Sequence, residues 1–284
     1  MAASRIASGR DNKLVTRLTH LRHSYLGFKP MFTLYAIFVF IFGLIIGSFL
    51  NVVIFRIDDL KTIWFTRSHC QNCKKILKWY DLAPLFSYLA LGGKCRFCKA
   101  KISAQYPIVE FFTAVSFLLL FLMLGLTISL FFYLIVFSIL IVVFVYDLKF
   151  QMVPEPFVWA ALVLALLGSW YFGNFGVWSM ILGGLVGGGI PAFLVLVSKE
   201  RWMGAGDIKI GAILGVLCGY PVVFFGMFLA FLVGAIVGLV YIKIASKTIK
   251  AAMPFAPFLI FAAYISVMYG AAIVSWYWGG MYLR

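Results

Sequence analysis

Five long uncharged stretches constrain the fold of this chain more than any other feature. They cover residues 31–55, 111–146, 156–197, 210–242 and 251–283. One helical crossing of a bilayer takes about 20 residues, so the second, third and fourth stretches must be helical hairpins. Hydrophobic residues make up 64% and charged residues 12% of the 284 positions, which excludes an ordinary soluble domain and a disordered chain. The sequence therefore predicts an all-α polytopic membrane protein.

Turn-forming residues divide the longer stretches. Gly125-Leu126-Thr127, Gly173–Gly176 and Cys218–Pro221 each interrupt a helical pattern. These breaks predict eight transmembrane helices, near residues 31–55, 107–124, 128–146, 156–172, 178–197, 207–219, 221–242 and 255–276. The sixth is short, because 13 residues at about 1.5 Å each do not cross about 30 Å of hydrocarbon. We therefore expect Asp207, at its start, to lie inside the bundle.

Positive charge in the loops predicts the orientation of the chain. Residues 56–106 hold ten Lys or Arg, and residues 198–209 and 243–250 hold three each. With eight spans these three loops share one side, which the positive-inside rule assigns to the cytoplasm. The net charge of +15 is then explained by cytoplasmic loops and anionic lipid headgroups, and a nucleic-acid partner is not expected.

The basic segment 1–30 does not fit this pattern. It carries six Lys or Arg and a single acid, yet the topology places it on the outer side. Two interpretations stay open: an amphipathic or disordered tail that the larger loop outweighs, or extra sequence before a natural start at Met31. We attach no function to this segment.

Four cysteines form the framework of the one sizeable polar segment, residues 56–106. Two C-x-x-C motifs, Cys70 with Cys73 and Cys95 with Cys98, are separated by 21 residues, close to the spacing of a four-thiolate zinc site. A segment of about 50 residues has little core, so a structural zinc ion would supply folding energy. Two disulfides are the alternative, although they seldom persist on the reducing side of the membrane.

Two polar residues flank this segment within the apolar helices. Asn51, near the end of the first span, must find a hydrogen-bond partner. It is either an interhelical clamp or a binding residue for a substrate or cofactor at the cytoplasmic mouth. Glu110, near the start of the second span, either complements the helix dipole or binds a cationic group such as an amine.

Two aspartates lie at the cytoplasmic ends of apolar spans, 60 residues apart. Asp147 ends the third span and Asp207 begins the sixth, and an ionisable residue at membrane depth indicates a functional site. If the two carboxyl groups face each other, they share a proton and act as base and acid of an aspartic protease. A proton-coupled transporter with a cytoplasmic zinc knot is the competing hypothesis, although the chain shows no convincing internal repeat.

Glycines are concentrated at two places in the second half of the chain. Gly204 and Gly206 permit backbone angles that other residues resist, so they predict a mobile turn that carries Asp207, beside Lys209, toward Asp147. The glycines of Gly183–Gly189 recur four apart, which predicts close packing between helices. Room for an extended substrate is the alternative for that segment.

Several short motifs occur in a fixed order along residues 31–284. They are Gly47–Val52, the two cysteine motifs, Trp79-Tyr80-Asp81, Gly93–Cys98, Tyr106-Pro107 with Glu110, Asp147-Leu148-Lys149 and Gly204–Lys209. This ordered set resembles the type IV prepilin peptidases, the bifunctional leader peptidases and N-methyltransferases of bacterial inner membranes. The chain departs from the family in carrying Glu155 after Pro154, where members commonly have Asp.

The resemblance implies that Asp147 and Asp207 are the catalytic pair of a GxGD-type intramembrane aspartyl protease. The substrates would be prepilins or pseudopilins, cut on the cytoplasmic side between a leader Gly and usually a Phe. The enzyme would then methylate the exposed amine with S-adenosylmethionine.

The implied domains are the tail 1–30, transmembrane helix 31–55, the cytoplasmic zinc-bearing methyltransferase part 56–106 and the peptidase part 107–284. Candidate substrate- or cofactor-binding residues are Asn51, Asp81, Gly93 and Glu110, together with Gly204, Gly206 and Lys209.

Overall fold

Helices form nearly all of the regular structure in the computed structural model, which describes residues 29–57, 61–173, 175–245 and 253–282. In this part of the chain, seven helical stretches are long and apolar enough to cross a membrane. The long helices are α2 (Lys29–Phe55), α5 (Gln105–Leu124), α6 (Ile128–Phe150), α7 (Glu155–Phe172), α8 (Val177–Ser198), α10 (Val222–Ala245) and the consecutive α11 (Ala256–Ile265) and α12 (Ala271–Tyr282). Short helices are α3 (Lys61–Phe65), η1 (Trp79–Leu82), α4 (Phe86–Ala90) and α9 (Ala205–Cys218). The all-α membrane fold is confirmed.

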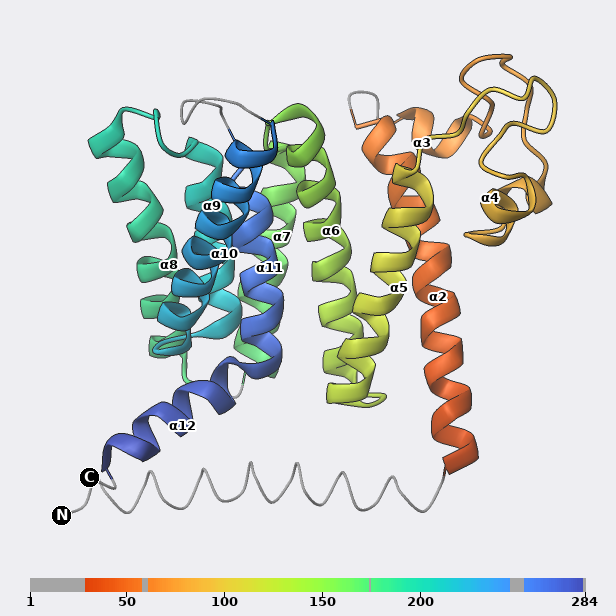
Figure 1. Cartoon of the computed structure of the whole chain (residues 1–284). Helices are drawn as coiled ribbons and strands as arrows, with labels where there is room; N and C mark the ends of the chain where they lie inside the picture. The colour runs from red at the N-terminus through yellow and green to blue at the C-terminus, as the bar shows by residue number, and fades with distance from the viewer. Residues whose placement is uncertain (1–28, 58–60, 174, 246–252, 283–284) are drawn as a thin grey trace.

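The predicted topology places the basic loops at one end of the bundle. Figure 1 shows successive long helices running in opposite directions, with the loop between α2 and α5 at the same end as the start of α9. The end of α6 and the start of α11 also lie there. Of the predicted tail, residues 1–28 lie outside the described residues, and Lys29 and Pro30 open α2.

Two helix pairs, α2 with α5 and α8 with α9, pack along each other most extensively among the described residues. On α8, a Cβ added to Gly187 would lie 2.2 Å from the carbonyl oxygen of Gly211 in α9. A Cβ added to Gly183 would lie 2.3 Å from the carbonyl oxygen of Gly215. The glycines of α8 therefore pack against glycines of α9, which confirms their predicted packing role.

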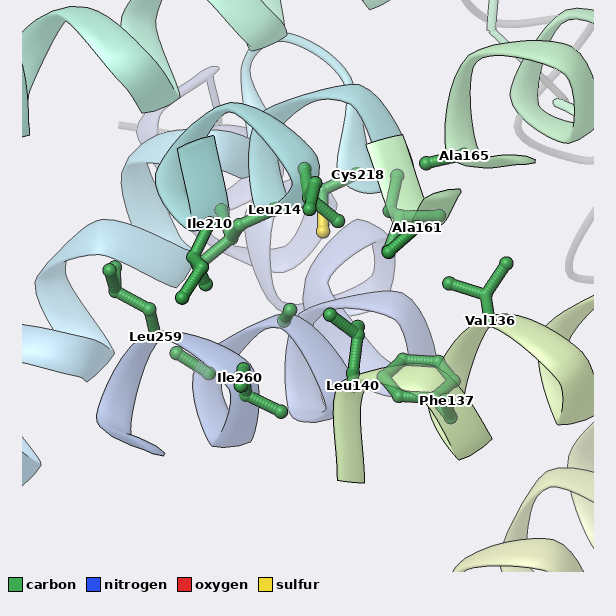
Figure 2. Packing of buried hydrophobic residues seen from close by; sticks show 14 of the residues in the cluster. Val136, Phe137, Leu140, Ala161, Ala165, Ile210, Leu214, Cys218, Leu259 and Ile260 are labelled. Atoms are coloured by element: carbon green, nitrogen blue, oxygen red, sulfur yellow. The ribbon is translucent and has the colours of Figure 1, made fainter. Parts of the chain in front are cut away.

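The short helix α9 lies at the centre of the second half of the chain. It packs against α7, α8, α10 and α11, and most of its side chains are buried. Figure 2 shows its apolar residues meeting those of α6, α7 and α11 in one core. With 14 residues it is about 21 Å long, so it is shorter than the hydrocarbon layer, as predicted for the sixth span.

The last span is bent, which the sequence did not predict. A π-helical turn, η2 (Ser266–Gly270), separates α11 from α12, and Figure 1 shows α12 turning away from the bundle. Such a turn changes the hydrogen-bond register and is a common cause of a helix kink.

Candidate active site and metal centre

Helix α7 packs against both α6 and α9, and this arrangement brings Asp147 and Asp207 into one region. Asp147 lies in the last turn of α6 and Asp207 in the first turn of α9. Their exposed fractions are 4% and 6%, and the charge of Asp147 acts on Asp207. Within the described residues, no hydrogen bond joins the two carboxyl groups directly. The site therefore holds two buried carboxyl groups within Coulombic range of each other.

The turn predicted before Asp207 is instead the regular start of helix α9. Gly204 has φ −79° and ψ 153°, and its N–H donates to Asp207 Oδ2 over 3.2 Å, one half of a capping box. Gly206 lies inside the regular helix α9, where an added Cβ would be 2.6 Å from Val153 Cγ2. Neither glycine has the left-handed backbone that would demand it. Gly206 is needed because the first turn of α9 touches the connection between α6 and α7.

Lys209 forms an ion pair across the starts of two helices. Its Nζ lies 2.6 Å from Oε1 and 2.5 Å from Oε2 of Glu155, the first residue of α7. Trp159 Nε1 also donates to Glu155 Oε2 over 3.0 Å. An ion pair this exposed contributes about 0–1 kcal/mol, so its main effect is to fix the start of α9 relative to α7.

The four cysteines form one cluster. The Sγ atoms of Cys70, Cys73, Cys95 and Cys98 all lie within 4.8 Å of one another, and none is in a disulfide. The Cys70 and Cys98 sulfurs are 3.8 Å apart, which matches the separation of about 3.8 Å for tetrahedral Zn–S bonds of about 2.3 Å. The cluster fits a metal ion of zinc's size, and the two-disulfide alternative is not what the structure has.

The two cysteine motifs have the same backbone conformation. Lys74 N donates to Cys70 O over 2.9 Å, and Lys99 N donates to Cys95 O over 3.0 Å. Lys74 and Lys99 both have left-handed backbones, with φ 57° and 59°. Each motif therefore turns its two sulfurs toward the shared centre by the same local fold.

Ionisation of the thiols depends on their immediate neighbours. The backbone N–H of Ala100 lowers the pKa of Cys98 to about 6. At Cys73 the backbone N–H of Lys75 favours the thiolate, but desolvation and the neighbouring sulfurs outweigh it and raise the pKa to about 11. Four ionised thiols this close need a cation between them, as a thiolate metal site provides.

Asp81 and Gly93 shape the segment that carries these motifs. Asp81 is buried and accepts a hydrogen bond of 2.8 Å from Arg96 Nε, which ties η1 to the second cysteine motif and raises the pKa of Arg96. Gly93 has a left-handed backbone, φ 67°, and an added Cβ would lie 3.0 Å from Tyr88 Oη. Glycine is therefore required there both for the backbone and for the position of the Tyr88 ring.

A cavity of about 840 Å³ separates the cysteine segment from the ends of α2 and α5. Tyr88, Tyr106 and Gln105 line it, together with the predicted residues Asp81 and Glu110. The Nε2 atom of Gln105 is buried and has no hydrogen-bond partner, so it is an unused donor at the wall. A cavity of this size suits a ligand of cofactor size, typically about 300–1,000 Å³.

Asn51 and Glu110 make hydrogen bonds that fix the ends of α2 and α5 and the backbone at Leu85 beside this cavity. Asn51 Nδ2 donates to Gly47 O over 3.3 Å and to Tyr106 O over 3.1 Å, so the amide clamps α2 to α5. Glu110 is 6% exposed, and its Oε2 accepts a hydrogen bond of 2.9 Å from Leu85 N. Leu85 has φ 58°, an unfavourable conformation for leucine that this contact holds in place.

Gln105 and Lys149 line the cavity but were not among the predicted site residues. Lys149 comes from the end of α6, two residues after Asp147, whereas the other lining residues come from α2, α5 and the segment between them. Lys149 belongs to the motif Asp147-Leu148-Lys149 but was noted there only beside Asp147, and Gln105 belongs to no motif. Their common position follows from the packing of α2 against both α5 and α6.

Comparison with known proteins places the chain in a family. Residues 41–124 match the family model described as "Bacterial Peptidase A24 N-terminal domain", and residues 134–239 match the "Type IV leader peptidase family". A prepilin leader peptidase/N-methyltransferase of Bacillus subtilis is 32% identical over 246 residues, covering 84% of this chain and 96% of the relative. Proteins of the same name from Aeromonas salmonicida (32% over 274 residues; 86% and 94%) and Legionella pneumophila (30% over 267; 84% and 93%) are also similar.

No solved structure is significantly similar to the chain. The matches give no support to the alternative of a proton-coupled transporter. They extend across both the cysteine segment and the helices that bear the two aspartates. The identities of 30% or more over nearly the whole length of these relatives mean that the chain belongs to the type IV leader peptidase family.

Proposed function

We propose that this protein is a membrane aspartyl endopeptidase that removes the basic leader from type IV prepilins or pseudopilins and then methylates the new N-terminal residue. The leader is cut after a Gly on the cytoplasmic side, and the methylated residue is usually Phe. The burial of Asp147 and Asp207 within Coulombic range of each other carries this proposal. The enzyme is a multi-pass protein of the bacterial inner membrane, with the zinc-bearing segment in the cytoplasm.

The two carboxyl groups act as general base and general acid in peptide hydrolysis. Like-charge repulsion at a buried site favours one shared proton, so one group is ionised while the other is protonated. The ionised group takes a proton from the attacking water, and the protonated group donates to the carbonyl oxygen. The proton taken from water then passes to the departing amine, which becomes the N-terminus of the mature pilin, and the proton on the former carbonyl oxygen returns to the carboxylate that donated it.

Methyl transfer belongs to the cavity between the cysteine segment and the ends of α2 and α5. S-adenosylmethionine, when bound, supplies an electrophilic methyl group. Tyr88 and Tyr106 offer aromatic faces for its adenine, and Gln105 Nε2 offers the unused donor. The Glu110 carboxylate would orient the acceptor amine and take up the proton that it loses. On this proposal the methylating part includes α2 and α5 as well as residues 56–106.

Zinc in the four-cysteine cluster would be structural. Four thiolates fill a tetrahedral shell and leave no position open for substrate. The metal would hold the two cysteine motifs together and thereby hold Asp81 and Arg96 at the cavity wall.

The decisive experiment incubates the purified protein with a prepilin peptide, with and without S-adenosylmethionine, and weighs the products. We expect leader loss in both reactions and one additional methyl group only with the donor. Asp147→Asn and Asp207→Asn should each abolish cleavage and leave the metal content unchanged. Full cleavage by either single variant would rule out the catalytic pair.

Glu110→Gln tests the methylating half separately, on a peptide that already lacks its leader. Glutamine keeps the oxygen that accepts from Leu85 but removes the charge, so we expect methylation to fall roughly 100-fold with cleavage retained. Glu200→Gln, which neutralises an exposed acid at the same end of the bundle, is the matched control. Normal methylation by Glu110→Gln would remove Glu110 from the proposal.

A further inference from the structure

The short helices η1 and α4, which lie between the two cysteine motifs in the sequence, expose large apolar side chains. Trp79 in η1 is 83% exposed, and Phe86 and Leu89 in α4 are 71% and 74% exposed. Exposed apolar groups that gather in one place mark a surface that binds a partner or a membrane. The two helices therefore need an apolar partner that the chain itself does not supply among the described residues.

The exposed side chains share one face of each short helix. Trp79 and Leu82 are three residues apart in the 3-10 helix η1, so they lie on the same side. Phe86 and Leu89 are likewise three residues apart in α4, which places them on one face. Tyr88, by contrast, lines the cavity described above. Helix α4 thus turns one face toward the cavity and an apolar face away from it.

A hydrogen bond places α4 at the level of the membrane helices. Leu85, the residue before α4, donates its backbone N–H to Glu110 Oε2 over 2.9 Å. Glu110 lies in α5, about 7.5 Å along the helix axis from Gln105. Helix α5 has 20 residues and is about as long as the hydrocarbon layer is thick, roughly 30 Å. The start of α4 therefore lies near the boundary between headgroups and hydrocarbon, where amphipathic helices bind.

The arrangement in Figure 1 agrees with this position. Helix α4 is level with the first turns of α5, whereas the loops between α3 and α5 that surround it extend beyond the ends of the long helices. The apolar face of α4 is thus presented at the depth of the bilayer surface, and the cysteine motifs are not needed to cover it.

Positive charge accompanies this apolar face. Residues 56–106 hold ten Lys or Arg against three acids. Lys78 and Lys94, both exposed, flank η1 and α4 in the sequence. Basic residues next to membrane helices are attracted to anionic lipid headgroups, and tryptophan favours the membrane interface. An apolar face with basic flanks fits a lipid surface better than it fits a second apolar protein.

We infer that the apolar face of η1 and α4 binds the lipid leaflet at the basic end of the bundle. The side chains of Trp79, Phe86 and Leu89 enter the boundary between headgroups and acyl chains, and the flanking lysines contact anionic headgroups. Helix α4 then separates lipid on one face from the cavity on the other, so the bilayer itself holds the wall that carries Tyr88. This inference goes beyond the proposed function and does not rest on it.

Photocrosslinking of the full-length protein in lipid nanodiscs tests the contact. The photoreactive amino acid p-benzoylphenylalanine replaces Phe86 in one variant and Phe97, an exposed ring of the second cysteine motif, in the matched control. The nanodiscs contain phosphatidylcholine with or without phosphatidylglycerol. Intact-mass analysis after irradiation should find a several-fold higher yield of lipid adducts at position 86 than at position 97, and phosphatidylglycerol should raise the yield at position 86.

The inference would be overturned by the absence of lipid adducts at position 86, by equal yields at the two positions, or by crosslinks from position 86 to a second copy of the chain in place of lipid. A yield that phosphatidylglycerol leaves unchanged would remove the lysines from the contact. The readout involves neither a prepilin nor S-adenosylmethionine, so its failure leaves the proposed function standing.

A charge placed in the apolar face should weaken the contact. Leu89→Asp, combined with the photoreactive residue at position 86, should lower the adduct yield several-fold. Ile76→Asp is the control, because Ile76 is also apolar and exposed (56%) but pairs with His69 beside the first cysteine motif, and it should leave the yield unchanged. Thermal unfolding in detergent, where no bilayer is present, should be the same for both variants. An unchanged yield in Leu89→Asp would remove Leu89 from the contact.

Discussion

At the scale of single residues, the conformation before Asp207 is set by contact and not by flexibility. The motif Gly204–Asp207 suggested a mobile turn, because glycine is the residue that tolerates unusual backbone angles. In the structure the backbone angles are ordinary, and it is the missing side chain of Gly206 that counts. Val153 occupies the space that any side chain at position 206 would need.

Gly206→Ala should therefore impair cleavage. The new methyl group would meet Val153 at 2.6 Å and push the first turn of α9, with Asp207, away from Asp147. A displacement near 1 Å can cost about 100-fold in rate, so we expect a fall in kcat of that order. Gly204→Ala is the matched control, since its methyl group would meet only Asp207 Oδ2, at 3.9 Å. Equal activities of the two variants would contradict this account.

Some candidate site residues could be identified in the sequence from the chemistry of their side chains. The interactions of others are seen only in the contacts of the folded structure. Asp147 and Asp207 stood out because charge is costly within apolar spans. Lys209 lies beside Asp207 in the motif, yet its contacts are with Glu155 and Trp159 of α7. Asn51 likewise forms the clamp that was one of its two predicted roles. The position of Lys209 beside Asp207 in the sequence thus did not reveal its partners.

At the scale of helices, the α8–α9 interface fixes the position of Asp207. Glycines on both helices allow backbone to meet backbone, and α9 is enclosed by α7, α8, α10 and α11. A helix buried on all sides contacts little lipid, which is consistent with its short length. The interface was foreseen from the glycines of α8, but its partner was not, since the glycines of α9 lie within an ordinary apolar run.

Gly187→Ala tests this interface, with Gly189→Ala on the same helix as its control. The Gly187 methyl group would lie 2.2 Å from Gly211 O, whereas nothing lies within 4 Å of a Cβ at Gly189. Overpacking of this kind typically costs about 1–3 kcal/mol, so thermal unfolding in detergent should show a lower Tm for Gly187→Ala. Alanine at position 189 should be neutral or raise the Tm, because alanine favours helix over glycine by about 1 kcal/mol. A normal Tm for Gly187→Ala would show that the helices are not packed so closely.

At the scale of the whole molecule, the chain has a part that is organised around the four-cysteine cluster and a part that is held by helix packing. The four cysteines lie in the segment between α2 and α5. The two aspartates lie in α6 and α9, which both pack against α7. The cavity lies between the cysteine segment and the ends of α2 and α5. Loss of the metal should consequently affect the two activities unequally.

Removal of the metal, by a chelator or by Cys95→Ser, should reduce methylation much more than cleavage. Cys95 is the most buried of the four cysteines, at 4% exposure, so water cannot take the place of the thiolate that Cys95→Ser removes. Elemental analysis should find zinc in the wild-type protein and little in the variant. Cys218→Ser, which changes a cysteine of the helical core, is the control that should keep its zinc. Normal methylation by metal-free protein would contradict the scaffold role.

The sequence by itself determined the membrane class, the order of the long helices, the common end of the basic loops, the cysteine cluster and the two aspartates. These features follow from hydropathy, charge and short-range spacing, which act within a few residues of the chain. Only the tertiary structure decided the contact of Gly206 with Val153, the pairing of Lys209 with Glu155, the bend before α12 and the cavity that Lys149 enters. Apart from the bend, these features join residues dozens of positions apart, and their contacts depend on how whole helices pack. The bend is a local change of helical register, for which the apolar sequence around it gives no signal.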